Sequence, residues 1–149
     1  MNSKVTVAGA GALGLSSAIA LADAGCTVTV YDPAPEGVGA SGVAAGMLAP
    51  ALEAVLDPQA AAHFDLLLAA RDAWPSLAAR TGVYIDRSGA LATGSPDWLE
   101  GVAAGLTRLG LHATELPAVA AEDLAPGLNG DLRALMMRED WRLDPLQAL

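Results

Sequence analysis

The chain has 149 residues, of which 17 are acidic and 8 basic, giving a net charge of −9. This length suits one domain that can bury a sizeable core, and the negative charge argues against nucleic acid or an anionic membrane surface as a partner. The single cysteine, Cys26, and the lack of a secretory signal or of an apolar run of about 18 residues predict a cytoplasmic protein without a membrane span.

The N-terminal segment predicts a β-α-β unit. Residues Lys4–Ala8 alternate and are β-branched, as in a strand, and residues 13–24 carry apolar side chains at helical spacing before Gly25, a typical C′ residue. Residues Thr27–Tyr31 have the pattern of a second strand. Two strands joined by a helix in this way form a parallel pair with a right-handed crossover.

The middle of the chain predicts helices separated by short strands. Apolar residues at helical spacing predict a helix over residues 58–80, which Pro75 would kink or interrupt. The following segment predicts two short strands around a turn at residues 87–89. Ser95, followed by a proline and an acid, is a helix start, and that helix should run to about Leu109.

The C-terminal part predicts a short helix and a turn within residues 118–130, a strand within residues 131–137 and a helix that begins at Asp144 and Pro145. That last helix has hardly begun where the sequence ends, and so short a helix is marginal by itself. Hydrophobic residues make up 53% of the sequence, and the mean hydropathy is high, at +0.39. We therefore expect a piece of a longer protein, or one polypeptide of a two-chain protein, with part of its surface covered.

A glycine motif lies between the first strand and the first helix. Gly9, Gly11 and Gly14 form the pattern G-x-G-x-x-G, in which the glycines permit a tight turn, approach of a pyrophosphate and close packing of helix on strand. Asp32 ends the second strand, where an acid accepts hydrogen bonds from an adenosine ribose and repels a 2′-phosphate. The motif therefore predicts a dinucleotide other than NADP. The alternative is a glycine-rich turn that binds nothing.

Residues 37–46 form a second segment rich in glycine and alanine. In a plain nicotinamide-binding domain, a helix and a third strand soon follow the second strand. Small residues here would instead let the main chain lie against a large flat ligand and direct N–H groups at its phosphates and ring atoms, and Ser41 adds a hydroxyl. A surface loop is the alternative, but the continuation AAGMLAP is apolar where a surface loop would be polar. The segment favours FAD over a nicotinamide cofactor.

Together these segments resemble a known enzyme family. The motif GAGALG, the acid in VYDP and the stretch GASGVAAGMLAP are similar to the FAD-dependent amino-acid oxidases of the D-amino-acid oxidase superfamily, and most of all to the glycine oxidases of thiamine biosynthesis. The stretches GVYIDRSGALATGSP and LDPLQAL resemble that family's first substrate-domain strands and a later helix start. The resemblance covers essentially the whole chain, and AAGML is its most distinctive part.

The resemblance implies a fold and a set of cofactor contacts. The fold class is α/β, with the N-terminal part of a Rossmann-type FAD-binding domain over residues 1–80 and the beginning of an α+β substrate domain over residues 81–149. The three glycines of the motif would hold the cofactor together with residues at four places. These are Ala12 and Leu13 at the pyrophosphate turn, Asp32 and Pro33 at the adenosine, Ala40 and Ser41 at the phosphates, and Ala45, Gly46 and Met47 against the isoalloxazine, with Met47 toward the substrate.

The family's chemistry implies that the flavin takes a hydride from the α-carbon of a small amino acid, that an imino acid forms and that O2 becomes H2O2, while the protein supplies position and electrostatics. Family members are much longer, so the groups that hold the substrate carboxylate should lie outside the chain, which by itself should be inactive. Glycine, sarcosine and small D-amino acids all stay open as substrates. The alternatives are another flavin- or NAD-dependent oxidoreductase and a non-catalytic dinucleotide-binding subunit.

No catalytic side chain and no metal site are predicted. Neither His63 nor His112 has a cysteine or carboxylate at metal-ligand spacing, so a structural or solvent-facing role is favoured for both. Glu53, just after GMLAP, is interpreted as a solvated helix residue rather than as part of an active-site entrance.

Overall fold

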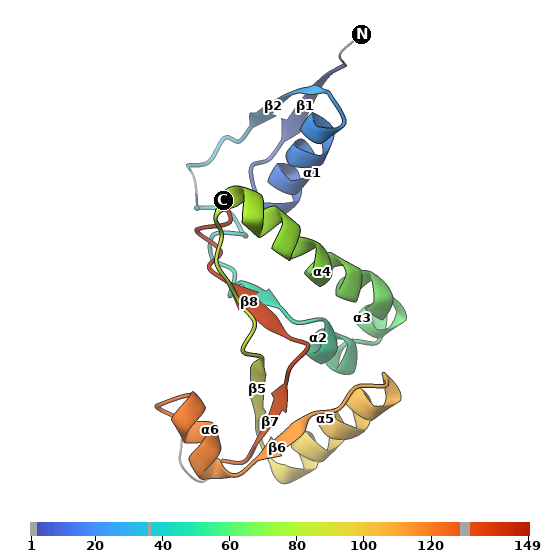
Figure 1. Cartoon of the computed structure of the whole chain (residues 1–149), viewed down its shortest axis with the longest axis vertical. Helices are drawn as coiled ribbons and strands as arrows, with labels where there is room; N and C mark the ends of the chain where they lie inside the picture. The colour runs from blue at the N-terminus through green and yellow to red at the C-terminus, as the bar shows by residue number, and fades with distance from the viewer. Residues whose placement is uncertain (1–2, 36, 129–131) are drawn as a thin grey trace. The chain divides into compact units, whose positions relative to one another are not determined.

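The computed structural model describes residues 3–35, 37–128 and 132–149. The chain forms two units, which Figure 1 shows with their elements in chain order from blue to red. The first unit comprises the residues up to Gly46 together with Leu143–Leu149, and the second comprises Met47–Arg142. Each unit has its own helices and sheet, so each is described by itself.

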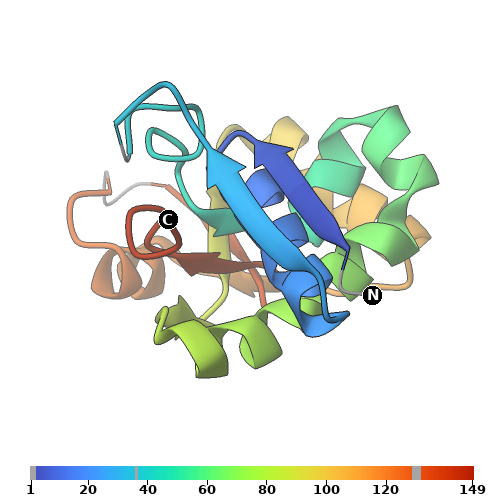
Figure 2. The same ribbon diagram turned by 90° about the horizontal axis from the view of Figure 1, so that it is seen from above.

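A parallel pair of strands and one connecting helix form the centre of the first unit. β1 (Lys4–Ala8) pairs with β2 (Thr27–Tyr31), and α1 (Ala12–Asp23) connects them. The valines of both strands are half-buried and alternate with exposed residues. Figure 2 shows that the strands point the same way, with α1 against one face of the pair. Gly25 follows the helix with φ +85°, a conformation that favours glycine, and the predicted β-α-β unit is confirmed.

Apart from Leu143, the described remainder of the first unit consists of turns, bends and irregular segments. Among the described residues of this unit only Leu143 is buried, and its N–H donates to Gly46 O at 2.9 Å. A Cβ on Gly46 would collide with Leu143 O, so only glycine allows this approach. The C-terminal residues therefore pack along the end of the glycine-rich segment within one unit.

The predicted helix at Asp144 and Pro145 is wrong, because these residues form a turn. Asp144 Oδ1 accepts the N–H of Leu146 at 2.9 Å, and its carbonyl accepts the N–H of Gln147 at 3.2 Å. Such a side-chain bond to the backbone two residues on is typical of a turn started by aspartate.

The second unit holds most of the helices. They are α2 (Pro50–Leu56), α3 (Pro58–Ala62), α4 (Phe64–Thr81), α5 (Pro96–Arg108) and α6 (Ala118–Leu124). Ser95 Oγ accepts the N–H of Trp98 at 3.3 Å and starts α5, which ends shortly before Gly110, as predicted. Across the described parts of the chain, no helix is both long enough and apolar enough to cross a membrane.

The helix predicted over residues 58–80 is two helices that meet at His63, and its predicted interruption at Pro75 is wrong. His63 ends α3, and its carbonyl accepts the N–H groups of Leu66 and Leu67 at 3.0 and 3.1 Å to start α4. α4 then continues through Pro75. Arg71, one turn before this proline, donates through Nη1 to the carbonyl and the carboxylate of Glu139.

The described residues of the second unit form two small sheets, and the last residue of one strand, Leu143, belongs to the first unit. In order across each sheet, their strands are β3 (Met47–Leu48), β8 (Trp141–Leu143) and β4 (Ile85–Asp86), and β5 (Ala90–Thr93), β7 (Ala134–Met137) and β6 (Thr114–Leu116). The two strands predicted around residues 87–89 are present as β4 and β5, but they belong to different sheets. The strands β3, β6 and β8 are too short to show a period of two in the sequence.

The core of the second unit lies where α5 covers the β5-β7-β6 sheet. Its buried members are Ala51, Ala92, Leu99, Val102, Leu106, Leu135 and Met137. The three from α5 are spaced three or four residues apart and so share one helix face. Gly105 lies on the same helix, and a Cβ there would come within 2.7 Å of Val55 Cγ1, so a larger residue would push α5 away from α2.

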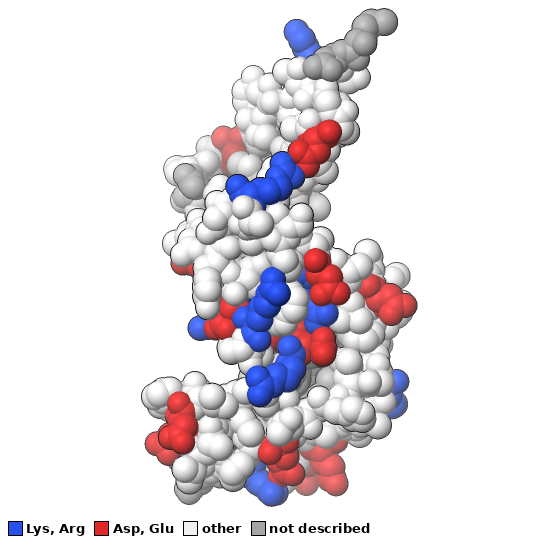
Figure 3. Space-filling model, viewed as in Figure 1, with Lys and Arg blue, Asp and Glu red and all other residues white. Residues whose placement is uncertain are grey.

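A buried arginine connects α4 to the turn before β8. Arg71 is 8% exposed, and its Nη1 donates to Glu139 O at 2.6 Å and to Glu139 Oε2 at 2.7 Å. Its Nε and Nη2 donate to Asp72 Oδ1 at 3.0 and 2.8 Å. Burial lowers the pKa of Arg71, but the bonds to Glu139 and Asp72 outweigh this effect, so the pKa is raised. Figure 3 shows acidic and basic side chains next to one another in the middle of the view, over this unit.

The lowered pKa of Asp86 predicts that the chain loses stability in acid. The Asp86 carboxylate accepts hydrogen bonds from Ser88 and then from Arg142, and these lower its pKa from 3.8 to about 2. As the pH falls below about 4, the unfolded chain takes up this proton before the folded chain does, so the free energy of unfolding falls until about pH 2. Asp86→Asn should lose less stability than the wild-type chain between about pH 5 and pH 2.5, by up to about 1 kcal/mol in urea unfolding, because Arg142 is exposed.

Glu100→Gln is the matched control for Asp86→Asn. It removes an exposed carboxylate of α5 that has no ion pair among the described residues, so its acid dependence should stay that of the wild-type chain. If Asp86→Asn lost stability in acid as steeply as the wild-type chain, the Asp86 bonds would have no part in it.

Candidate functional site

The glycine turn after β1 brings α1 and β1 close together. Gly9 has φ +106°, and its N–H donates to Tyr31 O at 2.7 Å, which extends the pairing of β1 with β2 into the turn. Gly14 faces back onto this residue, because a Cβ at Gly14 would collide with Gly9 O. The first and third glycines of the motif thus serve the tight turn and the close packing that the pattern predicts.

Asp32 closes this turn from the end of β2. Its Oδ2 accepts the N–H of Ala10 at 2.7 Å, and its Oδ1 accepts the N–H of Ala34 at 2.9 Å. The bond from Ala10 and then that from Ala34 hold the pKa of Asp32 below its ordinary value, so the carboxylate is ionised near neutral pH. Each oxygen keeps a lone-pair site for a further donor, such as a ribose hydroxyl.

Ser41 connects the second glycine-rich segment to the start of α1. Its Oγ accepts the N–H of Ala12 at 3.0 Å. The N-cap of this helix, Gly11, has no side chain for that purpose, so Ser41 supplies the cap from 29 residues along the chain. A Cβ on Gly11 would lie 3.0 Å from Ser41 Oγ, which leaves little room for a larger residue. The two glycine-rich segments are therefore in direct contact.

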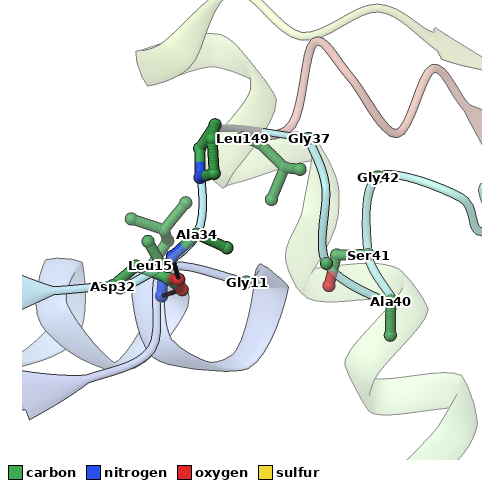
Figure 4. Close-up of a pocket in the computed structure, with 12 residues that line it drawn as sticks. Gly11, Leu15, Asp32, Ala34, Gly37, Ala40, Ser41, Gly42 and Leu149 are labelled. Atoms are coloured by element: carbon green, nitrogen blue, oxygen red, sulfur yellow. Dashed lines mark hydrogen bonds between the residues drawn. The ribbon is translucent and has the colours of Figure 1, made fainter.

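These segments line a pocket of about 490 Å³ within the first unit. Figure 4 shows Asp32 and the start of α1 on one side and the loop that carries Gly37, Ser41 and Gly42 on the other. The volume lies within the range of about 300–1,000 Å³ that small-molecule sites occupy. The lining residues are Ala10, Gly11, Leu15, Asp32, Ala34, Pro35, Gly37, Gly39, Ala40, Ser41, Gly42 and Leu149.

The polar groups around this pocket suit a ligand that carries phosphates. Leu13 and Gly14 lie in the first turn of α1, where no carbonyl four residues back inside the helix can accept their N–H groups. The positive end of the helix dipole adds to the attraction for an anion. Asp32 supplies a negative charge at the end of β2, beside the glycine turn (Figure 4), which suits ribose hydroxyls and repels a 2′-phosphate. The donor and acceptor set fits a dinucleotide with free ribose hydroxyls.

The predicted cofactor residues fall into three groups. Those that line the pocket are Gly11, Asp32, Ala40 and Ser41. Those elsewhere in the first unit are Ala12, Leu13 and Gly14 at the start of α1, and Gly9, Pro33, Ala45 and Gly46 outside its helix and strands. Met47 belongs to the second unit, where it begins β3 and is 50% exposed.

Several pocket residues carry no signal of their own in the sequence. Ala10 and Ala34 act through backbone N–H groups, so no side-chain type marks them. Gly42 belongs to the segment that its composition singles out. The need for a glycine at this position is local, because a Cβ on Gly42 would collide with Gly37 O. Over the described residues, no group of three His, Cys, Asp or Glu side chains lies together as metal ligands would.

A family comparison covers almost the whole chain. Residues 4–149 match the family model DAO, described as FAD dependent oxidoreductase. No curated protein matches the chain. Among solved structures, iminodiacetate oxidase from Chelativorans sp. BNC1 is 28% identical with a TM-score of 0.75, and the match covers 96% of this chain and 42% of that one.

Two glycine oxidases have a similar fold. The enzyme from Geobacillus kaustophilus is 23% identical with a TM-score of 0.78, and the match covers 99% of this chain and 43% of that one. The enzyme from Bacillus cereus ATCC 14579 is 20% identical with a TM-score of 0.69, over 99% of this chain and 41% of that one. The predicted α/β fold of an FAD-binding domain is confirmed, and the chain spans less than half the length of these relatives.

Ser41→Ala should loosen the contact between the two glycine-rich segments. It leaves the N–H of Ala12 without its side-chain acceptor and should lower the free energy of unfolding by about 1 kcal/mol, as lost helix caps do. Amide hydrogen exchange at Ala12 should become faster. Ser17→Ala is the matched control, because the exposed Ser17 hydroxyl donates only within its own helix, to Leu13 O. Equal exchange at Ala12 in both variants would show that Ser41 does not hold this helix start.

Proposed function

This chain belongs to the DAO family of FAD dependent oxidoreductases, and on that premise we propose that it supplies the FAD-binding part of an amino-acid oxidase. The observation that carries the proposal is the pocket of the first unit, where the glycine turn, Asp32 and Ser41 meet. The N–H groups and the Ser41 hydroxyl are donors that suit the two phosphates in the ADP half of FAD. The Asp32 carboxylate is an acceptor that suits its unmodified ribose.

The first turn of α1 and the loop opposite would hold the phosphates. The N–H groups of Leu13 and Gly14 would donate to phosphate oxygens, and Ala40 would contact them. The Ser41 hydroxyl accepts the N–H of Ala12, so its own proton can be donated to a phosphate oxygen at the same time. Asp32, with Pro33 beside it, would accept hydrogen bonds from the ribose hydroxyls.

The end of the glycine-rich segment would lie against the isoalloxazine. Ala45 and Gly46 have little or no side chain, so a flat ring can approach their backbone. Gly46 has φ +71° and is held by Leu143, which gives this part of the main chain a fixed course. Met47 follows directly, and its half-exposed apolar side chain would face the substrate side of the ring.

When bound, FAD would accept a hydride from the α-carbon of a small amino acid, which leaves an imino acid, and O2 would take the two electrons and two protons to give H2O2. The described residues would bind and orient the cofactor, and we assign no catalytic role to any of them. A glycine-like substrate is supported by the similarity to an iminodiacetate oxidase and to glycine oxidases.

The remaining part of the site would come from outside this chain. Because the chain spans 41–43% of its structural relatives, we propose that a second polypeptide or a further part of the same protein binds the substrate carboxylate. The division into an FAD-binding part over residues 1–80 and a substrate part over residues 81–149 stays a prediction. A cytoplasmic location and a place in thiamine biosynthesis are predictions as well.

Cofactor binding tests the proposal. The chain should quench the fluorescence of added FAD, ADP should compete for the site, and FMN, which lacks the adenosine half, should not. Asp32→Asn removes the charge that the ribose hydroxyls would use and should weaken FAD and ADP alike by about tenfold. Asp97→Asn, an exposed acid of α5 outside the pocket, is the control and should bind like the wild-type chain. FMN binding as tight as FAD binding, or no effect of Asp32→Asn, would contradict the assignment.

The chain alone should not oxidise glycine. Because the groups that bind the substrate carboxylate are proposed to lie elsewhere, a peroxidase-coupled assay with FAD and glycine or sarcosine should detect no H2O2 above free FAD. A sample that also contains the rest of the protein should be active. Steady turnover by the chain alone would overturn the proposed division of the site.

A further inference from the structure

The C-terminal segment, Leu143–Leu149, lies beside the second glycine-rich segment within the first unit. At one end of that glycine-rich segment, Gly46 O accepts the N–H of Leu143 at 2.9 Å. At its other end, a Cβ on Gly37 would lie 3.1 Å from Leu146 Cδ2, so the Leu146 side chain packs against the backbone of Gly37. The C-terminal segment therefore contacts the glycine-rich segment at both of its ends.

Hydrogen bonds bend the C-terminal segment into a turn. Asp144 Oδ1 accepts the N–H of Leu146 at 2.9 Å, and Pro145 O accepts the N–H of Ala148 at 3.3 Å. The first of these is the bond by which an aspartate side chain stabilises a turn. Leu149 follows the turn directly and lines the pocket that is assigned to the cofactor. A segment more than 100 residues beyond the glycine turn thus supplies part of the pocket wall.

Leu149 gives this pocket one of its few large apolar side chains. Figure 4 shows the Leu149 side chain directed into the space between Asp32 on one side and Ser41 on the other. The residue is half-buried. Most of the lining residues are glycines and alanines, and the larger apolar ones are Leu15, Pro35 and Leu149.

The order of groups in the cofactor indicates where its base would lie. The phosphates are assigned to the start of α1 and to Ser41, and the ribose is assigned to Asp32. Adenine is joined to the end of the ribose opposite the phosphates, so it would extend past Asp32. The next lining residues along the chain there are Ala34, whose N–H donates to Asp32 Oδ1, and Pro35. Both offer apolar surface to a flat ring.

We propose that Leu149 packs against the adenine ring of the bound cofactor, an inference that rests on the proposed function. The purine would lie between the Leu149 side chain and the wall that contains Ala34 and Pro35. The faces of the ring are largely apolar, so covering them with aliphatic groups removes them from water. The C-terminal segment is then a third part of the cofactor site, beside the two glycine-rich segments.

Leu149→Ala tests this contact. It removes the branched end of the side chain that would cover the ring, so ADP and FAD should each bind about fivefold more weakly. Inorganic pyrophosphate has the phosphates without the base, so its affinity should stay within about twofold of the wild-type value. FAD fluorescence reports FAD binding directly and reports ADP and pyrophosphate by displacement. A loss of pyrophosphate affinity equal to the loss of ADP affinity, or no loss of ADP affinity, would overturn the inference.

Leu146→Ala is the matched control. It is the same substitution in the same turn, but Leu146 is 61% exposed and is not among the residues that line the pocket. The bond to Asp144 uses the backbone N–H of Leu146 and is kept. ADP affinity should stay within about twofold of the wild-type value. If Leu146→Ala weakened ADP as much as Leu149→Ala does, the shape of the turn would be responsible and the proposed contact would be wrong.

A conservative variant separates the apolar contact from the identity of the side chain. Leu149→Met keeps an apolar side chain of similar volume, so ADP should bind to within about twofold of the wild-type affinity. A loss as large as that of Leu149→Ala would contradict an apolar contact. A wild-type chain that binds neither FAD nor ADP would instead overturn the proposed function, and this inference with it.

Discussion

The close approach of α1 to β1 at Gly9 and Gly14 is the constraint on which the first unit depends. A side chain at Gly14 would collide with Gly9 O, so the helix can begin where it does only because the residue has none. The turn between them presents the N–H of Ala10 to Asp32 at the end of β2. The pocket is thus made by backbone segments that come close together, and large side chains contribute little to its walls.

Two helices of the chain, α1 and α2, are capped by side chains that lie far away in the sequence. Gly11 at the start of α1 and Ala49 at the start of α2 have no side-chain oxygen, and Ser41 and Asp140 supply acceptors from far along the chain. A small residue at Gly11 leaves the pocket open, and an apolar residue at Ala49 can be buried. The distant caps satisfy the helix starts and also join segments that are separate in sequence, which a local cap cannot do.

The features that were predicted correctly depend on neighbours in the sequence. The β-α-β unit follows from periodicity and the glycine spacing, and α5 follows from the cap at Ser95. The family resemblance, carried by the motif and by AAGML, is confirmed by the family match. Asp140, by contrast, stands in an acidic turn, and its partners are 89 residues away. α4 likewise continues through Pro75, a residue type that locally predicts an interruption.

The two units are stabilised differently, and this bears on the cofactor. The second unit has a core of buried apolar residues, whereas in the described part of the first unit Leu143 alone is buried. Leu13 and Tyr31 of the first unit are 83% and 66% exposed. Hydrogen bonds and glycine contacts therefore hold a unit that buries little apolar surface. A ligand at a hundred times its Kd that binds only the folded state adds about 2.7 kcal/mol of stability. For a unit with so small a core, binding FAD would then be a substantial part of what keeps it folded.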